Sequence, residues 1–112
     1  MDDLTNILIL TLTTGEEVIT NLKDHIEKVD GVDQKVCYNM VYPFVLVKSG
    51  TVNTENNSIG VQFVPWKLFS SDTGFLISYD NVVNMCTPLP SIKEQYKDGV
   101  DHFIKNLIKP IK

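Results

Sequence analysis

The chain has 112 residues, of which 43% are hydrophobic, so it is long and apolar enough to form one core without metals or disulfides. Its net charge is −4 and it contains no arginine, which weighs against tight binding to duplex DNA because arginine makes the strongest bidentate contacts to phosphates and base edges. No apolar run approaches the roughly 20 residues of a membrane helix, and the acidic start MDDLTN lacks the plan of a signal peptide, so we expect a cytoplasmic protein with no membrane partner.

The charge is distributed unevenly along the chain. Residues 1–35 carry eight acids and three lysines, residues 36–90 carry three acids and two lysines, and residues 91–112 carry three acids and five lysines. The acidic excess therefore lies in the N-terminal third, and a small basic excess lies at the C-terminus. Because the lysines are scattered rather than clustered, no electrostatic footprint of a nucleic-acid interface is visible.

The first third of the chain predicts a β-hairpin. Residues 7–12 place leucines at alternate positions, and residues 18–22 resume the alternation after a turn at Gly15, a residue that takes positive φ without strain. Residues 23–35 are polar and acidic, and we interpret them as a loop. His25 and its acidic neighbours do not supply three or four ligands at the spacing of a metal site, so we expect them to be solvated.

The longest predicted strand covers residues 36–47, where side chains alternate and both faces become apolar towards the end. Such a strand is expected to be central in the core or to lie in an oligomer interface. Pro43 cannot donate a ladder hydrogen bond, so the strand should bend or bulge there. Residues 48–58 predict an exposed hairpin loop, and residues 65–74 interrupt the alternation that resumes at Ile59.

Two apolar runs follow, Phe75–Ile77 and Val82–Met85, and the residues Ser78 to Asn81 between them predict a tight turn. The plan of short strands and frequent turns is a five- to six-stranded antiparallel meander. Because it lies in a single 112-residue chain, we treat residues 1–112 as one domain.

A helix is predicted over residues 91–109. Ser91 and Glu94 have the spacing of a capping box, with Ser91 as the N-cap. Its apolar residues fall on one stripe, which consists of Ile92, Tyr96, Val100, Phe103, Ile104 and Leu107. The stripe predicts either a lid on a barrel or a contact with a neighbouring subunit.

Side chains suited to catalysis are few. His25 and His102 are the histidines, and neither neighbours a cysteine or serine in a nucleophile motif. The chain has no glycine-rich phosphate loop and no metal constellation. Cys37 and Cys86 are expected to be reduced, buried thiols in the cytoplasm. We therefore expect no enzyme, no cofactor and no metal.

Two segments resemble the motifs of the Sm-like (Lsm) family. Leu8–Asp24, LILTLTTGEEVITNLKD, resembles the first Sm motif, and Phe75–Met85, FLISYDNVVNM, is similar to the second. In the first segment the motif positions are taken by Leu10, Leu12, Gly15, Thr20 and Leu22. The resemblance implies a small, strongly bent five-stranded Sm-like barrel over residues 1–90. The C-terminal helix predicted above over residues 91–109 follows from its own pattern and not from the resemblance, since the family's typical helix is N-terminal.

In that family, subunits form rings by pairing the fourth strand of one copy with the fifth strand of the next. The resemblance therefore implies a homo-oligomeric ring of about five to seven subunits. The interface residues it implies are Phe75, Ile77, Val82, Val83 and Met85.

The family binds single-stranded RNA inside the ring. Tyr38 matches the position that stacks on a base, and Asn39 matches the asparagine that reads it. Ser78 and Tyr79 stand where the family has an Arg-Gly pair. Two functions stay open for this chain: a ring that binds RNA, or a structural or protein-interaction ring without the RNA site.

The composition, free of arginine and alanine and rich in Asn, Lys and Ile, also resembles the divergent Sm-like proteins of tailed phages, the cyanophage type included. That resemblance implies a role during infection, in the cytoplasm of the host, in RNA regulation if RNA is bound.

Overall fold

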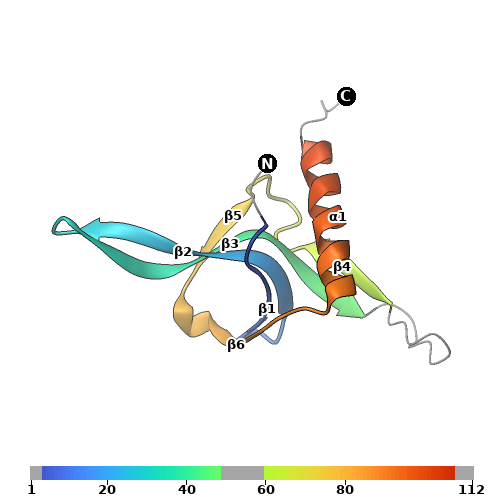
Figure 1. Cartoon of the computed structure of the whole chain (residues 1–112), viewed down its shortest axis with the longest axis horizontal. Coiled ribbons are helices and arrows are strands. Elements are labelled where there is room, and N and C mark those ends of the chain that lie inside the picture. The colour runs from blue at the N-terminus through green and yellow to red at the C-terminus, as the bar shows by residue number, and fades with distance from the viewer. Residues whose placement is uncertain (1–3, 49–59, 108–112) are drawn as a thin grey trace.

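In the computed structural model, which describes residues 4–48 and 60–107, the chain forms a six-stranded antiparallel sheet with a C-terminal helix (Figure 1). The sheet has the order β4-β3-β2-β1-β6, and β5 pairs with a second part of β3. The elements are β1 (Ile7–Leu12), β2 (Glu17–Val29), β3 (Val32–Lys48), β4 (Val61–Pro65), β5 (Gly74–Ile77), the 3₁₀ turn η1 (Tyr79–Asn81), β6 (Val82–Cys86) and α1 (Pro90–Leu107). The mostly β prediction is confirmed, but the sheet is not closed into a barrel.

The polar segment 23–35 is not a loop, so that prediction is wrong. It forms the outer half of a long hairpin between β2 and β3, which extends away from the body of the molecule (Figure 1). Asp30 and Gly31, with φ of 53° and 79°, close it in the left-handed conformations that two-residue hairpin turns need. Both faces of this arm are exposed, so the strand lacks the apolar alternation on which the prediction relied.

The bend expected at Pro43 is present. The preceding residue, Tyr42, has a φ of 51°, and the register of β2 against β3 shifts opposite it, between Ile19 and Asn21. The carbonyl of Pro43 accepts a hydrogen bond from the backbone N–H of Trp66 at 3.0 Å. The interruption expected over residues 65–74 is also present, because it separates β4 from β5. The loop expected over residues 48–58 lies almost wholly outside the described residues.

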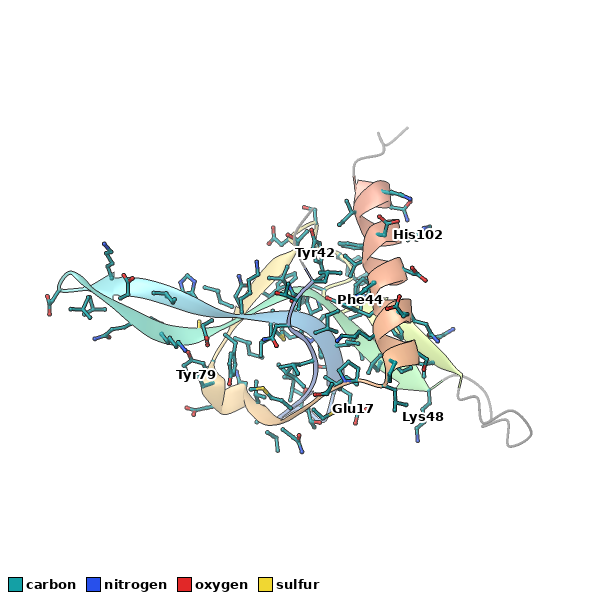
Figure 2. The ribbon with its side chains drawn as sticks, in the orientation of Figure 1. Glu17, Tyr42, Phe44, Lys48, Tyr79 and His102 are labelled. Atoms are coloured by element: carbon teal, nitrogen blue, oxygen red, sulfur yellow. The ribbon has the colours of Figure 1, made fainter. Side chains whose placement is uncertain are left out.

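The bent sheet has a cluster of buried side chains on each face. The concave face is lined by Leu10, Leu12, Val18, Leu22, Met40 and Ile77. The opposite face carries Ile7, Ile19, Val41, Tyr42 and Phe44, and α1 covers it (Figure 2). Of the two roles expected for the apolar stripe of the helix, the lid is therefore the one observed.

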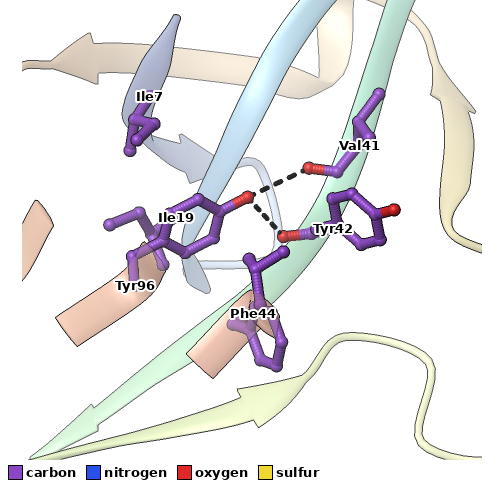
Figure 3. Close-up of a cluster of buried hydrophobic side chains, with 7 residues drawn as sticks. Ile7, Ile19, Val41, Tyr42, Phe44 and Tyr96 are labelled. Carbon is purple, nitrogen blue, oxygen red and sulfur yellow. Dashed lines mark hydrogen bonds between the residues drawn. The ribbon is translucent and has the colours of Figure 1, made fainter. Parts of the chain in front are cut away.

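Tyr96 attaches the helix to the bend. Its ring is fully buried, and its hydroxyl donates to the carbonyl of Tyr42 at 2.8 Å, with the carbonyl of Val41 at 3.2 Å (Figure 3). The same oxygen accepts a hydrogen bond from the backbone N–H of Asn21 at 3.0 Å. Burial raises the pKa of Tyr96 far above its ordinary value, so the hydroxyl keeps its proton. The phenol hydroxyl thus supplies hydrogen-bond partners to backbone groups at the point where the register of β2 against β3 shifts.

The helix begins at Pro90, one residue before the predicted start, and the prediction of Ser91 as N-cap is wrong. Proline suits the first helical position, because a backbone N–H at that position has no intrahelical acceptor and its absence therefore costs nothing. Ser91 therefore lies inside the first turn. Towards the other end of the helix, Asp101 and Lys105, four residues apart, form an ion pair with 3.1 Å between Oδ2 and Nζ.

Candidate functional site

Tyr38 and Tyr79, two of the predicted RNA-binding residues, lie together. Tyr38 is in β3, opposite Asp24 of β2 and Ile77 of β5, and packs at the border of the concave cluster. Tyr79 belongs to η1 and lies below the base of the hairpin arm (Figure 2). The ring centroids are 4.5 Å apart at an interplanar angle of 89°, an edge-to-face contact. The ring of Tyr79 therefore fills space directly beside the ring of Tyr38.

Charged side chains surround this tyrosine pair. The Tyr79 hydroxyl donates to Oδ1 of Asp24 at 3.4 Å, and Nζ of Lys35 lies 3.4 Å from Oδ2 of the same carboxylate. Partial removal of the hydroxyl from water, and then the negative charge of Asp24, raise the pKa of Tyr79. A carboxylate at this position repels a phosphate but accepts hydrogen bonds from N–H groups.

Asn39 does not join the pair, because neighbouring residues of a strand point to opposite faces. It lies opposite Leu76 of β5 and Lys23 of β2. Its Oδ1 is shut off from solvent and has no hydrogen-bond partner among the described residues. A Cβ on Gly74 would lie 3.0 Å from this oxygen. The absence of a side chain at Gly74 therefore provides the space that the Asn39 amide occupies. The structure thus places Asn39 under β5, away from Tyr38.

Ser78, the fourth predicted RNA-binding residue, has a local role. It precedes η1, and its Oγ accepts a hydrogen bond from the backbone N–H of Asp80 at 3.3 Å. This is the capping arrangement by which a serine side chain replaces a backbone partner at the start of a turn. Ser78 therefore shapes the passage from β5 to β6.

The predicted interface residues divide into two groups. Ile77 and Val82 point into the concave cluster, and Phe75 packs edge-to-face on Trp66 with 5.6 Å between ring centroids. Val83 and Met85 are instead 67% and 39% exposed along β6. The first group packs within the chain, and the second is available at its surface.

Sequence reasoning missed Leu76, which is 56% exposed on β5. The signal was present, since Leu76 alternates with Phe75 and Ile77 and must face the other way. It also missed Asp24 and Lys35, because the arm that carries them was interpreted as a loop.

Three strands lie at open edges of the sheet, β4, β5 and β6, and the last two carry the exposed apolar side chains named above. Within the described residues, β6 pairs only with β1, and β5 pairs only with β3. Each therefore leaves a row of backbone N–H and C=O groups without a strand partner. An open hollow of about 310 Å³ lies beside Met85 of β6, and another of about 280 Å³ lies beside Leu76 of β5. Both edges thus combine unpaired backbone, exposed apolar side chains and adjacent space.

Both cysteines are free, but the expectation of burial is wrong for Cys86, which is exposed, while Cys37 is half-buried. In the part of the chain that the structure describes, no group of three or more His, Cys, Asp or Glu side chains is arranged to hold a metal ion. No helix among the same residues is long and apolar enough to cross a membrane.

No family model matches the chain, and no curated protein is significantly similar to it.

Proposed function

We propose that the protein is a non-catalytic, ring-forming subunit of the Sm-like type, in which copies join by pairing β5 of one with β6 of the next. The observation that carries the proposal is the exposure of Leu76 on one edge and of Val83 and Met85 on the other. An unpaired edge strand with apolar side chains favours association with another chain. The strand order and the 3₁₀ turn between β5 and β6 support the same plan.

The two edges differ in sequence, so the proposed contact is heterologous. A heterologous contact closes into a ring if the rotation between copies allows it, and otherwise extends into a filament. The strong bend of β2 and β3 at Tyr42 favours closure, because it turns the two edges of one subunit in different directions. We propose five to seven subunits, in the cytoplasm.

The proposal is tested by light scattering coupled to size-exclusion chromatography. The expected mass is five to seven times the 12.7 kDa of one chain. A homogeneous species of 12.7 kDa at micromolar concentration would contradict the assembly. A mass that grows with concentration without limit would contradict ring closure alone.

For the role of the ring, we propose protein interaction or a structural function rather than RNA binding. Three features of the predicted RNA site support this choice. Tyr79 packs against Tyr38, the carboxylate of Asp24 lies beside them, and Oδ1 of the half-buried Asn39 is shut off from solvent. A base that stacked on Tyr38 would have to displace Tyr79, and its phosphate would meet a negative charge.

RNA binding is the second candidate, supported by the tyrosine pair with Lys35 close by. We expect no binding of labelled oligo-U or oligo-A at micromolar protein and low salt, where electrostatic attraction is strongest. Fluorescence anisotropy measures it. Binding that is lost in Tyr38→Ala and retained in Tyr79→Phe, which keeps the ring and removes the hydroxyl, would instead assign the RNA function.

A further inference from the structure

Large apolar side chains are exposed in the segment before β5 and in the segment after β6. The connection between β4 and β5 exposes Leu68 and Phe69, at 62% and 100%. The segment that follows β6 exposes Leu89, at 66%. Burial in the core of the chain does not account for these residues, and exposed apolar groups of this size are typical of contact surfaces.

The Phe69 turn, residues 67–70, is held in a defined shape. The backbone N–H of Ser70 donates to the carbonyl of Lys67 at 3.1 Å, which makes Leu68 and Phe69 the central residues of a β-turn. Such positions usually carry Gly, Pro, Asn, Asp or Ser. The ammonium group of Lys67 lies 4.4 Å from the ring centroid of Trp66, so a cation–π contact supports the base of the turn. The turn therefore presents two apolar side chains to the exterior at a fixed position.

The direction of strand pairing determines what this turn meets in a neighbouring copy. Every strand pairing among the described residues is antiparallel. Antiparallel pairing is slightly more stable per residue than parallel pairing, and purely antiparallel sheets are over-represented. If β5 pairs antiparallel with β6 of a second copy, the residues before Gly74 continue past Cys86 of that copy. The Phe69 turn of one copy then lies beside Leu89 of the next.

We propose that Leu68 and Phe69 of one copy pack against Leu89 of the next copy, as an apolar contact that flanks the paired strands. An open hollow of about 510 Å³ lined by residues 66–70 has room for the Leu89 side chain. The inference rests on the proposed edge-to-edge assembly. It adds the direction of pairing and assigns a partner to three otherwise unexplained side chains.

Cross-linking between two single-cysteine variants tests the contact. Phe69→Cys and Leu89→Cys are each made in a background with Cys37→Ser and Cys86→Ser, co-expressed, and treated with a short bismaleimide. We expect a covalent dimer from the co-expressed pair and not from either variant alone, because a link between different variants is necessarily intermolecular. Cross-linking of Phe69→Cys to Asp80→Cys in its place would indicate parallel pairing and overturn the proposal.

A serine substitution tests the energetic contribution. We expect Phe69→Ser to raise the concentration at which the assembly half-dissociates by about tenfold or more. Burial of a Phe side chain strengthens association by at least this factor in the dissociation constant. Val32→Ser, at a 60% exposed position on the tip of the hairpin arm, is the matched control and should leave it unchanged. An assembly of normal mass that is insensitive to Phe69→Ser and gives no 69–89 cross-link overturns this inference alone. A monomeric wild-type protein overturns the proposed function as well.

Discussion

Replacing Tyr96 by phenylalanine is expected to lower the free energy of unfolding by about 1 to 3 kcal/mol, the usual cost of removing one partner from buried hydrogen bonds. The change removes the hydroxyl that receives the N–H of Asn21 and donates to the carbonyls of Tyr42 and Val41. These groups lie where the ladder between β2 and β3 shifts, and the carbonyl of Val41 also accepts a hydrogen bond from the Thr20 hydroxyl at 2.8 Å, a partner it would keep. Tyr96→Ala should cost more, about 3 to 5 kcal/mol, because it also leaves a cavity between helix and sheet.

Urea unfolding followed by the fluorescence of Trp66 measures this loss. Tyr79→Phe is the matched control, because it removes the same hydroxyl from a surface pair whose bond to Asp24 is 3.4 Å long. We expect the control to stay within about 0.5 kcal/mol of the wild type, as exposed substitutions usually do. Equal losses in the two variants would contradict the role assigned to Tyr96.

The pH dependence provides a second measurement of the same group. The folded protein raises the pKa of Tyr96 above its ordinary value of 10.0, because burial disfavours the phenolate. A group whose folded pKa is raised contributes its full stability below the unfolded pKa and loses it progressively above that value. The wild type should therefore lose stability more steeply above about pH 10 than Tyr96→Phe, which cannot ionise at this position.

The strands with buried faces were predictable, and the arm with two exposed faces was not. Residues 7–12 are recognisable as a strand because Leu10 and Leu12 lie in the concave cluster and Ile7 lies in the cluster on the opposite face. Residues 23–29 form a strand because they pair with β3, and pairing between backbones leaves no periodic signal in the side chains. Hydrophobic patterning thus detects burial in a sheet rather than membership of it.

The helix stripe predicted burial but not what the stripe would contact. Its partner surface depends on the left-handed conformation of Tyr42, which is uncommon for a residue with a large side chain. It also depends on a hydrogen bond between Tyr96 and Asn21, which are 75 residues apart. Neither feature has a local signature in the chain.

The predicted RNA site shows the same limit. Tyr38 and Asn39 are adjacent in sequence and were assigned to one binding site. The strand that contains them continues through both, so their side chains leave opposite faces of the sheet. The contact between Tyr38 and Tyr79 follows from the pairing of β3 with β5, which puts Ile77 opposite Tyr38 and brings η1 to it.

The largest effect on assembly is expected from charges placed on the edge strands β5 and β6. Leu76→Lys on β5 or Val83→Lys on β6 should each convert the proposed ring to a 12.7 kDa monomer at micromolar concentration. Each lysine would replace an exposed apolar side chain on a strand edge, and lysine on an edge is a common means by which proteins prevent strand addition. Because both sites are more than half exposed, the stability of the monomer should change by no more than about 0.5 kcal/mol. Val32→Lys, on the tip of the arm, is the matched control and should assemble normally.

A pair of opposite charges then distinguishes pairing of the β5 and β6 edges from any other contact between copies. A chain with both Leu76→Glu and Val83→Lys carries opposite charges on its two edges, and every β5–β6 joint of the ring would bring one of each together. We expect this double variant to recover the assembled mass that Val83→Lys alone loses, and to lose it again at high salt, where charge pairs at a surface are screened. Assembly at normal mass in both Leu76→Lys and Val83→Lys would place the contact between copies on a surface other than these two strands. A double variant that stays at 12.7 kDa at low salt would contradict the proposal that Leu76 and Val83 meet at each joint.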